Sequence, residues 1–259
     1  SQKISVTQGA PTYEISYTTS NGKILPIEFQ WYHFRADVVS HEYVDGKGVI
    51  TFDRPIEYIA ADTFADCTTL TSITIPKSVT DCDGSIYGCT NLESIYGPYA
   101  SEDKRSLIIN GELSIFAPKG VTEYTIPEGV TSVGVGVFYK CSNLKKINIP
   151  DSVIEIKDSA FRECTALQSL IIPESVTTIP FAAIKGCVSL SNFDIPDGVT
   201  KIESYAFWDC KSLTSINIPA NIVSIGYAAF YQCSSLTSVN CKPINPPTLD
   251  DFAFHYNAF

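Results

Sequence analysis

A cysteine returns every 23 residues through much of the chain, at Cys141, Cys164, Cys187, Cys210 and Cys233. A leucine follows each of these cysteines three positions later, and the same pair occurs upstream at Cys67–Leu70 and Cys89–Leu92. A fixed period in the twenties is typical of a solenoid, in which each repeat forms one coil and buries its apolar edge against its neighbours. The period therefore predicts one continuous coiled body rather than a domain built around a conventional active site.

One full coil, from Asp151 to Pro173, reads DSVIEIKDSAFRECTALQSLIIP. Its closing Leu-x-x-Ile-x-Ile alternates as a half-buried strand does, and the proline ends the strand because proline cannot donate to a sheet ladder. The Val-x-x-Ile segment predicts a second short strand, and Ala-Phe-x-x-Cys predicts a helical turn that brings the chain back. We therefore expect a β-rich solenoid with short helical turns and a parallel main sheet on its concave face.

We expect the main strand eight times, beginning at Leu70, Leu92, Val121, Leu144, Leu167, Leu190, Leu213 and Leu236. A ninth strand, Val49–Phe52, should precede these eight. The gap from Cys89 to Cys141 is 52 residues, one ordinary coil of 23 plus one of 29. Within the long coil, Asn110-Gly111 interrupts an apolar run, which predicts a two-residue hairpin. We expect the main sheet to continue past this coil while the hairpin protrudes from one flank.

Three regions follow from this pattern. Residues 1–53 should form an N-terminal β cap, in which Asp45-Gly46-Lys47-Gly48 turns between two strands. Residues 54–240 should form the solenoid, with the irregular hairpin-bearing coil at 99–127. Residues 241–259 should form a C-terminal cap, which can be incomplete.

Composition narrows the classes of function. The chain has 259 residues and a net charge of −10, so nucleic acid is excluded as a partner because phosphate binding needs clustered Lys and Arg. No apolar run is long enough to span a bilayer. We recognise no signal or lipid-anchor segment, and the sequence has no methionine, so we expect a processed or trimmed chain.

Catalytic chemistry is missing from the sequence. Only three histidines occur, and no nucleophile motif, P-loop or dinucleotide fingerprint is present. Four successive coils carry an acidic residue directly after the proline: Glu128, Asp151, Glu174 and Asp197. This acidic row could bind a cation, but we favour the interpretation that these residues form turns and face solvent. We therefore predict a protein that is not an enzyme, with no catalytic residue, no metal and no cofactor.

The nine cysteines fall where the repeat places an inward apolar side chain. Free cysteine is among the most buried residue types, and side chains stacked in register point the same way rather than at one another. We expect nine free thiols, reactive only after denaturation. A second inward column, three residues before the cysteines, contains Phe64, Phe138, Phe161, Phe207 and Phe230, with Ile86 and Ile184 in two coils.

The recurring A-F-x-x-C-x-x-L-x-x-I-x-I-P-x-S-V-T units, from about Ile56 to Lys242, resemble the BspA-type leucine-rich repeats of bacterial surface proteins, the fifth leucine-rich-repeat family. The segment from Tyr99 to Leu113 also looks like an insert seen in gut Bacteroides members. The resemblance implies a leucine-rich-repeat solenoid, a right-handed superhelix, in a secreted or lipid-anchored protein of the cell surface. It further implies adhesion to host matrix proteins such as fibronectin and fibrinogen, or bacterial co-aggregation, without a shared catalytic motif.

A ligand would meet the outward residues of the main sheet, because solenoids use such surfaces for extended contacts. Most of these residues are small and polar. Four outward residues are not small and polar, and we combine them with two neighbouring asparagines, Asn148 and Asn192. Our candidate contact patch is therefore Tyr96, Lys146, Asn148, Ile171, Asn192 and Asp194. A second candidate is an aromatic row that consists of Tyr87, Tyr139, Trp208 and Tyr231 and is interrupted by Arg162 and Lys185. Exposed aromatic side chains can bind a ligand, but partial burial between coils is the explanation that we favour for this row.

Three functions remain open. The leading one is a monomeric surface adhesin that binds a host extracellular or bacterial surface protein through the concave sheet. The second is glycan capture for nutrient uptake, with the exposed aromatic side chains as the platform. The third is a passive spacer that holds another surface element away from the membrane.

Overall fold

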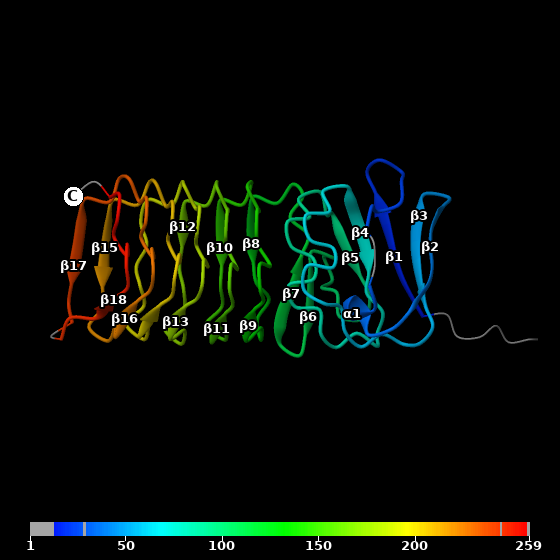
Figure 1. Ribbon diagram of the computed structural model, residues 1–259, viewed down its shortest axis with the longest axis horizontal. Helices are drawn as coiled ribbons and strands as arrows, with labels where there is room; N and C mark the ends of the chain where they lie inside the picture. The colour runs from blue at the N-terminus through cyan, green and yellow to red at the C-terminus, as the bar shows by residue number, and fades with distance from the viewer. Residues whose placement is uncertain (1–12, 28–29, 244, 258–259) are drawn as a thin grey trace, which may run out of the picture.

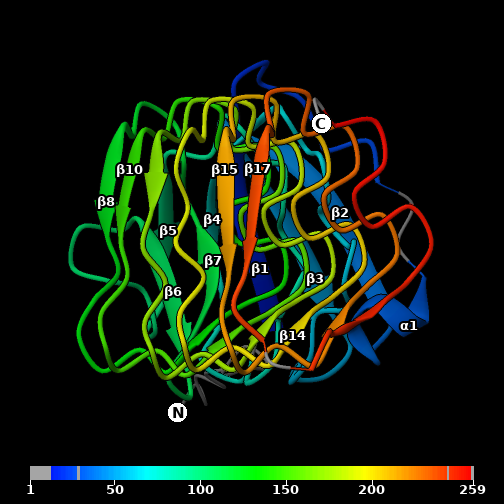
Figure 2. The same cartoon turned by 90° about the vertical axis from the view of Figure 1, so that its left-hand side faces the viewer.

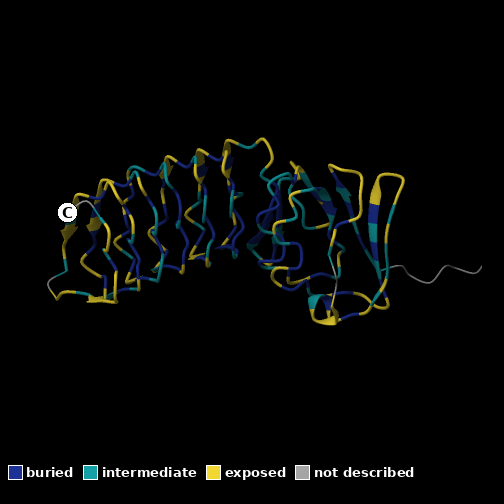
Figure 3. Cartoon of the chain, turned by 45° about the horizontal axis from the view of Figure 1, so that its top comes forward, coloured by how far each residue is buried: buried dark blue, intermediate teal, exposed yellow. Residues whose placement is uncertain are grey.

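The computed structural model describes residues 13–27, 30–243 and 245–257. Residues 1–12, 28–29, 244 and 258–259 of the two predicted caps lie outside these ranges. Coils stack along the long axis of an elongated rod, with the N-terminal strands at one end and the last coils at the other (Figure 1). Buried residues line the interior of the coils, and exposed residues gather at their corners (Figure 3). The predicted β-rich solenoid is confirmed.

The main sheet uses the last part of each coil. Its strands pair in parallel, and Lys146 lies opposite its equivalent one coil later, Ser169. The described main strands are β4 (Leu70–Thr74), β5 (Ser94–Tyr96), β8 (Glu123–Thr125), β10 (Lys146–Asn148), β12 (Ser169–Leu170), β15 (Ser215–Ile218) and β17 (Ser238–Cys241). In the end-on view these strands run from β8 and β10 at the left edge to β15 and β17 near the middle (Figure 2).

The strand expected after Leu190 is absent, so that prediction was wrong. Residues 191–196 contain no strand, and the main sheet is interrupted between β12 and β15. Phe193 is buried where β10 has Ile147, and its ring packs 5.0 Å from that of Phe207. A phenyl ring needs more room than an isoleucine side chain, and backbone shifts are the usual response to overpacking. We attribute the interruption of the ladder to this substitution.

The predicted second short strand is confirmed. These short strands pair in parallel in two separate ladders on one side of the coils, which together we call the second sheet. In it Ile179 lies opposite Ile202 and Ile202 opposite Ile225. The strands are β9 (Ser132–Val133), β11 (Glu155–Ile156), β13 (Thr178–Ile179), β14 (Lys201–Ile202), β16 (Ser224–Ile225) and β18 (Thr248–Leu249). Because β18 pairs with β16, residues near the C-terminus extend the same sheet.

The predicted helical turns are corrected. Ala-Phe-x-x-Cys folds as consecutive tight turns, and in the part of the chain that the structure describes the one α-helix is α1 (Trp31–Phe34), outside the repeats. The residue before the cysteine is left-handed, as at Glu163 (φ 58°) and Asp209 (φ 64°), and so is a residue four positions earlier, such as Ser159 (φ 57°). Left-handed residues cannot continue a right-handed helix, so each run stops after one turn.

The irregular coil contains the predicted hairpin, β6 (Ser106–Ile109) and β7 (Glu112–Phe116), with left-handed Asn110 and Gly111 at its turn. However, the hairpin does not protrude, because β7 pairs in parallel with β9 and thus joins the second sheet. Nor does the main sheet continue, since β5 and β8 lie in separate sheets. The buried side chains on both hairpin strands explain this correction: Leu107, Ile109, Leu113 and Ile115 gain more from the core than from solvent.

The N-terminal cap consists of β1 (Tyr13–Thr19), α1, β2 (Val38–Val44) and β3 (Lys47–Phe52). The predicted hairpin between β2 and β3 is confirmed. The prediction that Val49–Phe52 starts the solenoid sheet was wrong, because β1 lies between β3 and β4 and runs antiparallel to both. The cap thus closes the N-terminal end of the first coil with an antiparallel strand.

The interior divides into two apolar clusters that meet at the irregular coil. The phenylalanine column is fully buried, and the rings of Phe138 and Phe161 stack at 5.4 Å and 6°. All nine cysteines are free thiols, seven of them buried. Cys67 is half-buried and Cys241 is exposed, which contradicts the prediction that all nine are inaccessible before denaturation. Cys241 ends β17, the last strand of its sheet, where no described coil covers it.

Candidate functional site

All six predicted contact residues are exposed on the outer face of the main sheet or its continuation. Lys146 and Asn148 alternate with buried Ile147 on β10, and Asn148 donates a hydrogen bond to Thr125 Oγ1 over 2.9 Å. Ile171 follows β12 and is 79% exposed, the largest value among the exposed large apolar side chains of the described residues. An isoleucine in this position has no packing role.

The structure separates Tyr96 from the other five residues, which lie in three successive coils. Lys146 and Asn148 lie on β10, and Ile171 directly follows the adjoining strand β12. Asn192 and Asp194 lie in the next coil, which has no strand. Tyr96 lies on β5, beyond the break at the irregular coil, and Lys104 Nζ sits 4.8 Å from the centre of its ring. The sequence could not reveal this separation because it predicted an unbroken sheet.

The aromatic row at the turns forms two contacting pairs. Tyr87 and Tyr139 meet edge to face at 5.4 Å, and Trp208 lies 4.8 Å from Tyr231. The two cations that seemed to interrupt the row lie over its rings. Arg162 is 5.1 Å from the ring centre of Tyr139, and Lys185 is 4.3 Å from that of Trp208. Cation–π attraction therefore makes these cations part of the surface.

Sequence reasoning missed a second aromatic row beside the first. Phe181, Tyr205, Tyr227 and Phe252 contact one another edge to face, with ring centres 5.4, 5.4 and 5.6 Å apart. Tyr205 also lies 5.0 Å from Trp208 and thereby joins the two rows. The sequence repeat could have indicated this row, because its aromatic residues stand five or six positions before the cysteine of their coil. Phe181 and Tyr227 are six positions before the cysteine, and Tyr205 is five positions before it. We call the combined surface the aromatic band; its members are Phe181, Tyr205, Trp208, Tyr227, Tyr231, Phe252 and Tyr256.

Backbone strain accompanies this band. Tyr205 (φ 61°), Phe252 (φ 58°) and Tyr256 (φ 57°) hold bulky side chains in the left-handed region. The repeat imposes that conformation on each turn, and a non-glycine residue there costs about 1–2 kcal/mol. Glycine occupies the equivalent place at Gly136. Bulky aromatics in such positions are therefore consistent with a surface maintained for contact.

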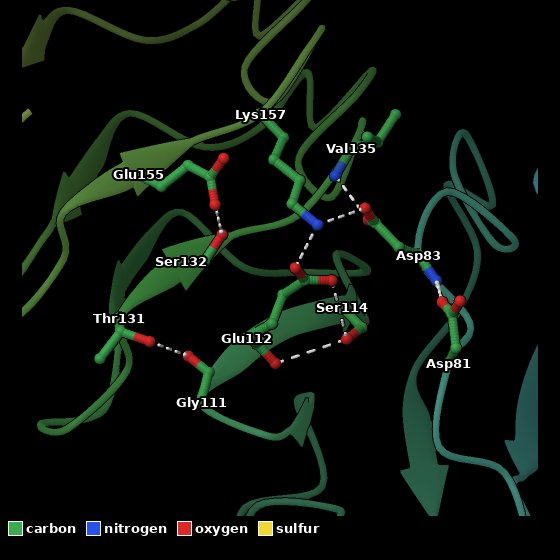
Figure 4. Close-up of polar contacts among 10 residues, drawn as sticks. All are labelled: Asp81, Asp83, Gly111, Glu112, Ser114, Thr131, Ser132, Val135, Glu155 and Lys157. Carbon is green, nitrogen blue, oxygen red and sulfur yellow. Dashed lines mark hydrogen bonds and ion pairs between the residues drawn. The ribbon is translucent and has the colours of Figure 1, made fainter. Parts of the chain in front are cut away.

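A charged cluster joins the two halves of the rod at the irregular coil (Figure 4). Lys157 Nζ lies 2.8 Å from Asp83 Oδ2 and also pairs with Glu112. Asp83 Oδ1 accepts the Val135 N–H over 2.7 Å. Burial opposes the charge of Lys157, yet the hydrogen bonds to both carboxylates raise its pKa above the ordinary 10.5. The lysine stays charged, and the cluster acts as a brace between the segments.

Burial raises the pKa of Glu112 more than its hydrogen bond to Lys157 lowers it. The acidic row proposed from the sequence is exposed at Glu128, Asp151, Glu174 and Asp197. Over the described ranges, no group of three or more His, Cys, Asp or Glu side chains has a geometry that could hold a metal ion. None of the helices in those ranges is both long and apolar enough to cross a membrane.

Comparison with known proteins agrees with this architecture. The sequence model of the family described as "BspA type Leucine rich repeat region" matches in six copies, over residues 48–106, 112–237 and 177–258. The chain is similar to a leucine rich cell surface protein from Faecalibacterium prausnitzii A2-165, at 29% identity and a TM-score of 0.65, over 72% of this chain and 52% of that one. No match is found among curated proteins.

A leucine-rich repeat protein from Eubacterium ventriosum ATCC 27560 is 27% identical, with a TM-score of 0.58, over 73% of this chain and 59% of that one. The pneumococcal vaccine antigen PcpA shares the fold at 23% identity and a TM-score of 0.59, over 73% of this chain and 49% of that one. The chain thus spans between half and three fifths of the first two of these structures.

Proposed function

Because the chain belongs to the BspA-type leucine-rich repeat family, we propose that it is a non-catalytic binding module of a secreted or cell-surface protein, engaging a protein partner. The similar protein from Faecalibacterium prausnitzii is described as a cell surface protein, which supports this location. The contact patch in this proposal is the outer face of the main sheet around Lys146, Asn148, Ile171, Asn192 and Asp194, with Tyr96 at a separate position.

The observation that carries the proposal is the exposure of Ile171. Its side chain is 79% exposed, although the adjacent Ile172 is buried at 5%. Lys146 lies on the neighbouring strand and Asp194 in the following coil, so an apolar centre is surrounded by charges of both signs. An apolar centre with a polar rim is the usual composition of a protein contact surface.

Surface plasmon resonance on immobilised fibronectin and fibrinogen tests this function. We expect saturable binding that weakens at least tenfold, about 1.4 kcal/mol, in the double variant Ile171→Ser and Lys146→Ala. Ser215→Ala, on the same face but further along the solenoid, is the matched control and should bind as the parent chain does. Equal binding by all three proteins would contradict the assignment of the patch.

Glycan capture is a second candidate because the aromatic band presents contacting rings at the surface, with Tyr227 39% and Phe252 48% exposed. Aromatic side chains combine a large apolar face with little loss of conformational entropy on binding. Binding to a glycan array that is lost in Tyr227→Ala and retained in Ile171→Ser would favour this candidate over the first. The opposite pattern would remove it.

A further inference from the structure

A small hollow lies beside the aromatic band, where three successive coils leave the second sheet. Glu203, Gly226 and Asp250 directly follow β14, β16 and β18, so they occupy equivalent positions. Two carboxylate side chains thus flank a position without a side chain. The resulting hollow measures about 230 Å³, and its wall also includes Phe181, Lys201, Ser204 and Ser224.

Gly226 is required by the close approach of the neighbouring coil. A Cβ atom at this position would lie 2.6 Å from the backbone nitrogen of Ser204, a distance that real Cβ atoms do not show. The floor of the hollow is therefore backbone, and the glycine keeps it open. Asp250 is held in the ladder because its N–H donates to the Ile225 carbonyl over 3.0 Å.

The wall combines one aromatic ring with fixed polar groups. Phe181 is 41% exposed and is held from behind by the edge-to-face contact with Tyr205. Its backbone N–H donates to Glu203 Oε2 over 3.2 Å, and Lys201 Nζ pairs with Glu203 Oε1 at 2.7 Å. The Glu203 carboxylate is therefore oriented by two partners before any ligand arrives.

We propose that this hollow binds one uncharged hexose unit of a glycan, a site distinct from the main-sheet patch and one that deepens the glycan candidate above. The sugar ring lies against Phe181, and its hydroxyls donate to the carboxylates of Glu203 and Asp250. A charged acceptor makes such a hydrogen bond stronger than a neutral acceptor does.

Size and charge select this class of ligand. The volume is below the range of about 300–1,000 Å³ typical of drug-sized ligands, which suits a single ring better than an extended peptide. Two carboxylates against one lysine leave a negative balance, which disfavours phosphate, sulfate and acidic sugars. A carboxylate accepts but does not donate, so several acceptors at fixed spacing favour a ligand with several hydroxyl donors. Glu203 is already paired with Lys201, so a lysine or arginine side chain from a peptide would find one carboxylate, that of Asp250, to pair with.

Saturation-transfer NMR on the full chain tests the proposal with glucose, galactose, mannose and N-acetylglucosamine as probes. Glucuronate serves as the anionic comparison and lysine methyl ester as the cationic one. We expect at least one neutral hexose to saturate with a Kd on the order of 1 mM, as for a small solvent-exposed ligand, and glucuronate to bind more weakly.

Phe181→Ala and Asp250→Asn should each weaken hexose binding at least fivefold in a protein that stays folded. Asp250→Asn should also keep the melting curve of the parent, because the Asp250 side chain is exposed. Ile171→Ala, on the main sheet, is the matched control and should bind the hexose normally. Silence from all four hexoses, binding only of lysine methyl ester, or unchanged affinity in both hollow variants would each overturn the proposal. The main-sheet function is tested by separate variants and can stand or fail independently.

Discussion

The thiol of Cys187 donates a hydrogen bond to the backbone carbonyl of Phe161, one coil earlier, over 3.1 Å. The same relationship joins Cys89 to Phe64, Cys164 to Phe138, Cys210 to Ile184, and Cys233 to Phe207. A cysteine side chain is small and apolar enough for the core, and its thiol is also a weak donor. The 23-residue cysteine period is thus a ladder that links each coil to the previous one.

Replacing Cys187 by alanine should lower the free energy of unfolding by about 1–3 kcal/mol, because the variant loses both the hydrogen bond and the packing of Sγ. Urea denaturation followed by circular dichroism measures the change. Cys241→Ala provides the control, since that side chain is exposed, and should stay within about 0.5 kcal/mol of the parent. Equal destabilisation by the two substitutions would contradict a structural role for the ladder.

Thiol reactivity should separate the nine cysteines into three groups. Burial raises the pKa of the Cys187 thiol well above the ordinary 9.0, so a buried cysteine is both inaccessible and protonated at pH 8. We expect rapid reaction of Cys241 with Ellman's reagent in the native protein, slower reaction of half-buried Cys67, and reaction of the seven buried thiols only in denaturant. Cys241→Ser should abolish the rapid phase. A native protein without a rapid phase would show that Cys241 is covered.

Adjacent isoleucines should differ sharply in their contribution to stability. Ile172 is 5% exposed and Ile171 is 79% exposed. Ile172→Ala should cost about 2–5 kcal/mol through lost burial and the cavity left behind. Ile171→Ala should change the unfolding free energy by less than about 0.5 kcal/mol. Thermal or urea unfolding of the pair tests the register of this coil directly, because a shift by one residue would exchange the two results.

Lys157→Met should destabilise the junction of the two halves, because the carboxylates of Asp83 and Glu112 would lose their shared cation. Breaking a buried pair costs about 3–5 kcal/mol, and partial exposure of this cluster reduces the expectation to about 1–2 kcal/mol. Lowering the pH through the range where the carboxylates become protonated should shrink the difference between variant and parent. Melting temperatures of both proteins at pH 7 and pH 4 measure it, and an unchanged difference would argue against an electrostatic brace.

The parent chain should also lose stability in strong base. The pKa of Lys157 is raised in the folded state, so its stabilising contribution is complete below the ordinary 10.5 and is lost as the pH rises above that value. In the Lys157→Met variant this alkaline loss should be smaller. Urea titrations at pH 9 and pH 11 compare the two, and identical alkaline losses would assign the effect to other groups.

Much of the fold could be predicted because every coil repeats the same environment. The period placed the buried columns at Phe161 and Cys187 and the exposed residue at Ile171, and the Asn110-Gly111 pair indicated the hairpin turn. Each of these depends on contacts within a coil or with the equivalent residue one coil away. For the candidate site, the same alternation identified the outward face of the main sheet, but it gave no information about which outward residues contact one another.

The sequence by itself determined the coil, its two strands and the residues that face inward, since a 23-residue period fixes those neighbours locally. Only the tertiary structure decided how non-equivalent segments meet. The antiparallel insertion of β1, the hairpin strand that joins the second sheet and the pairing of Lys157 with Asp83, 74 residues away, all fall outside the period. Three further features likewise depend on which unlike side chains stack: the break in the main sheet at Phe193, the joining of two aromatic rows at Tyr205 and the hollow at Gly226. The repeat specifies which positions of adjacent coils are in contact, whereas the packing at each coil depends on the particular side chains that occupy those positions.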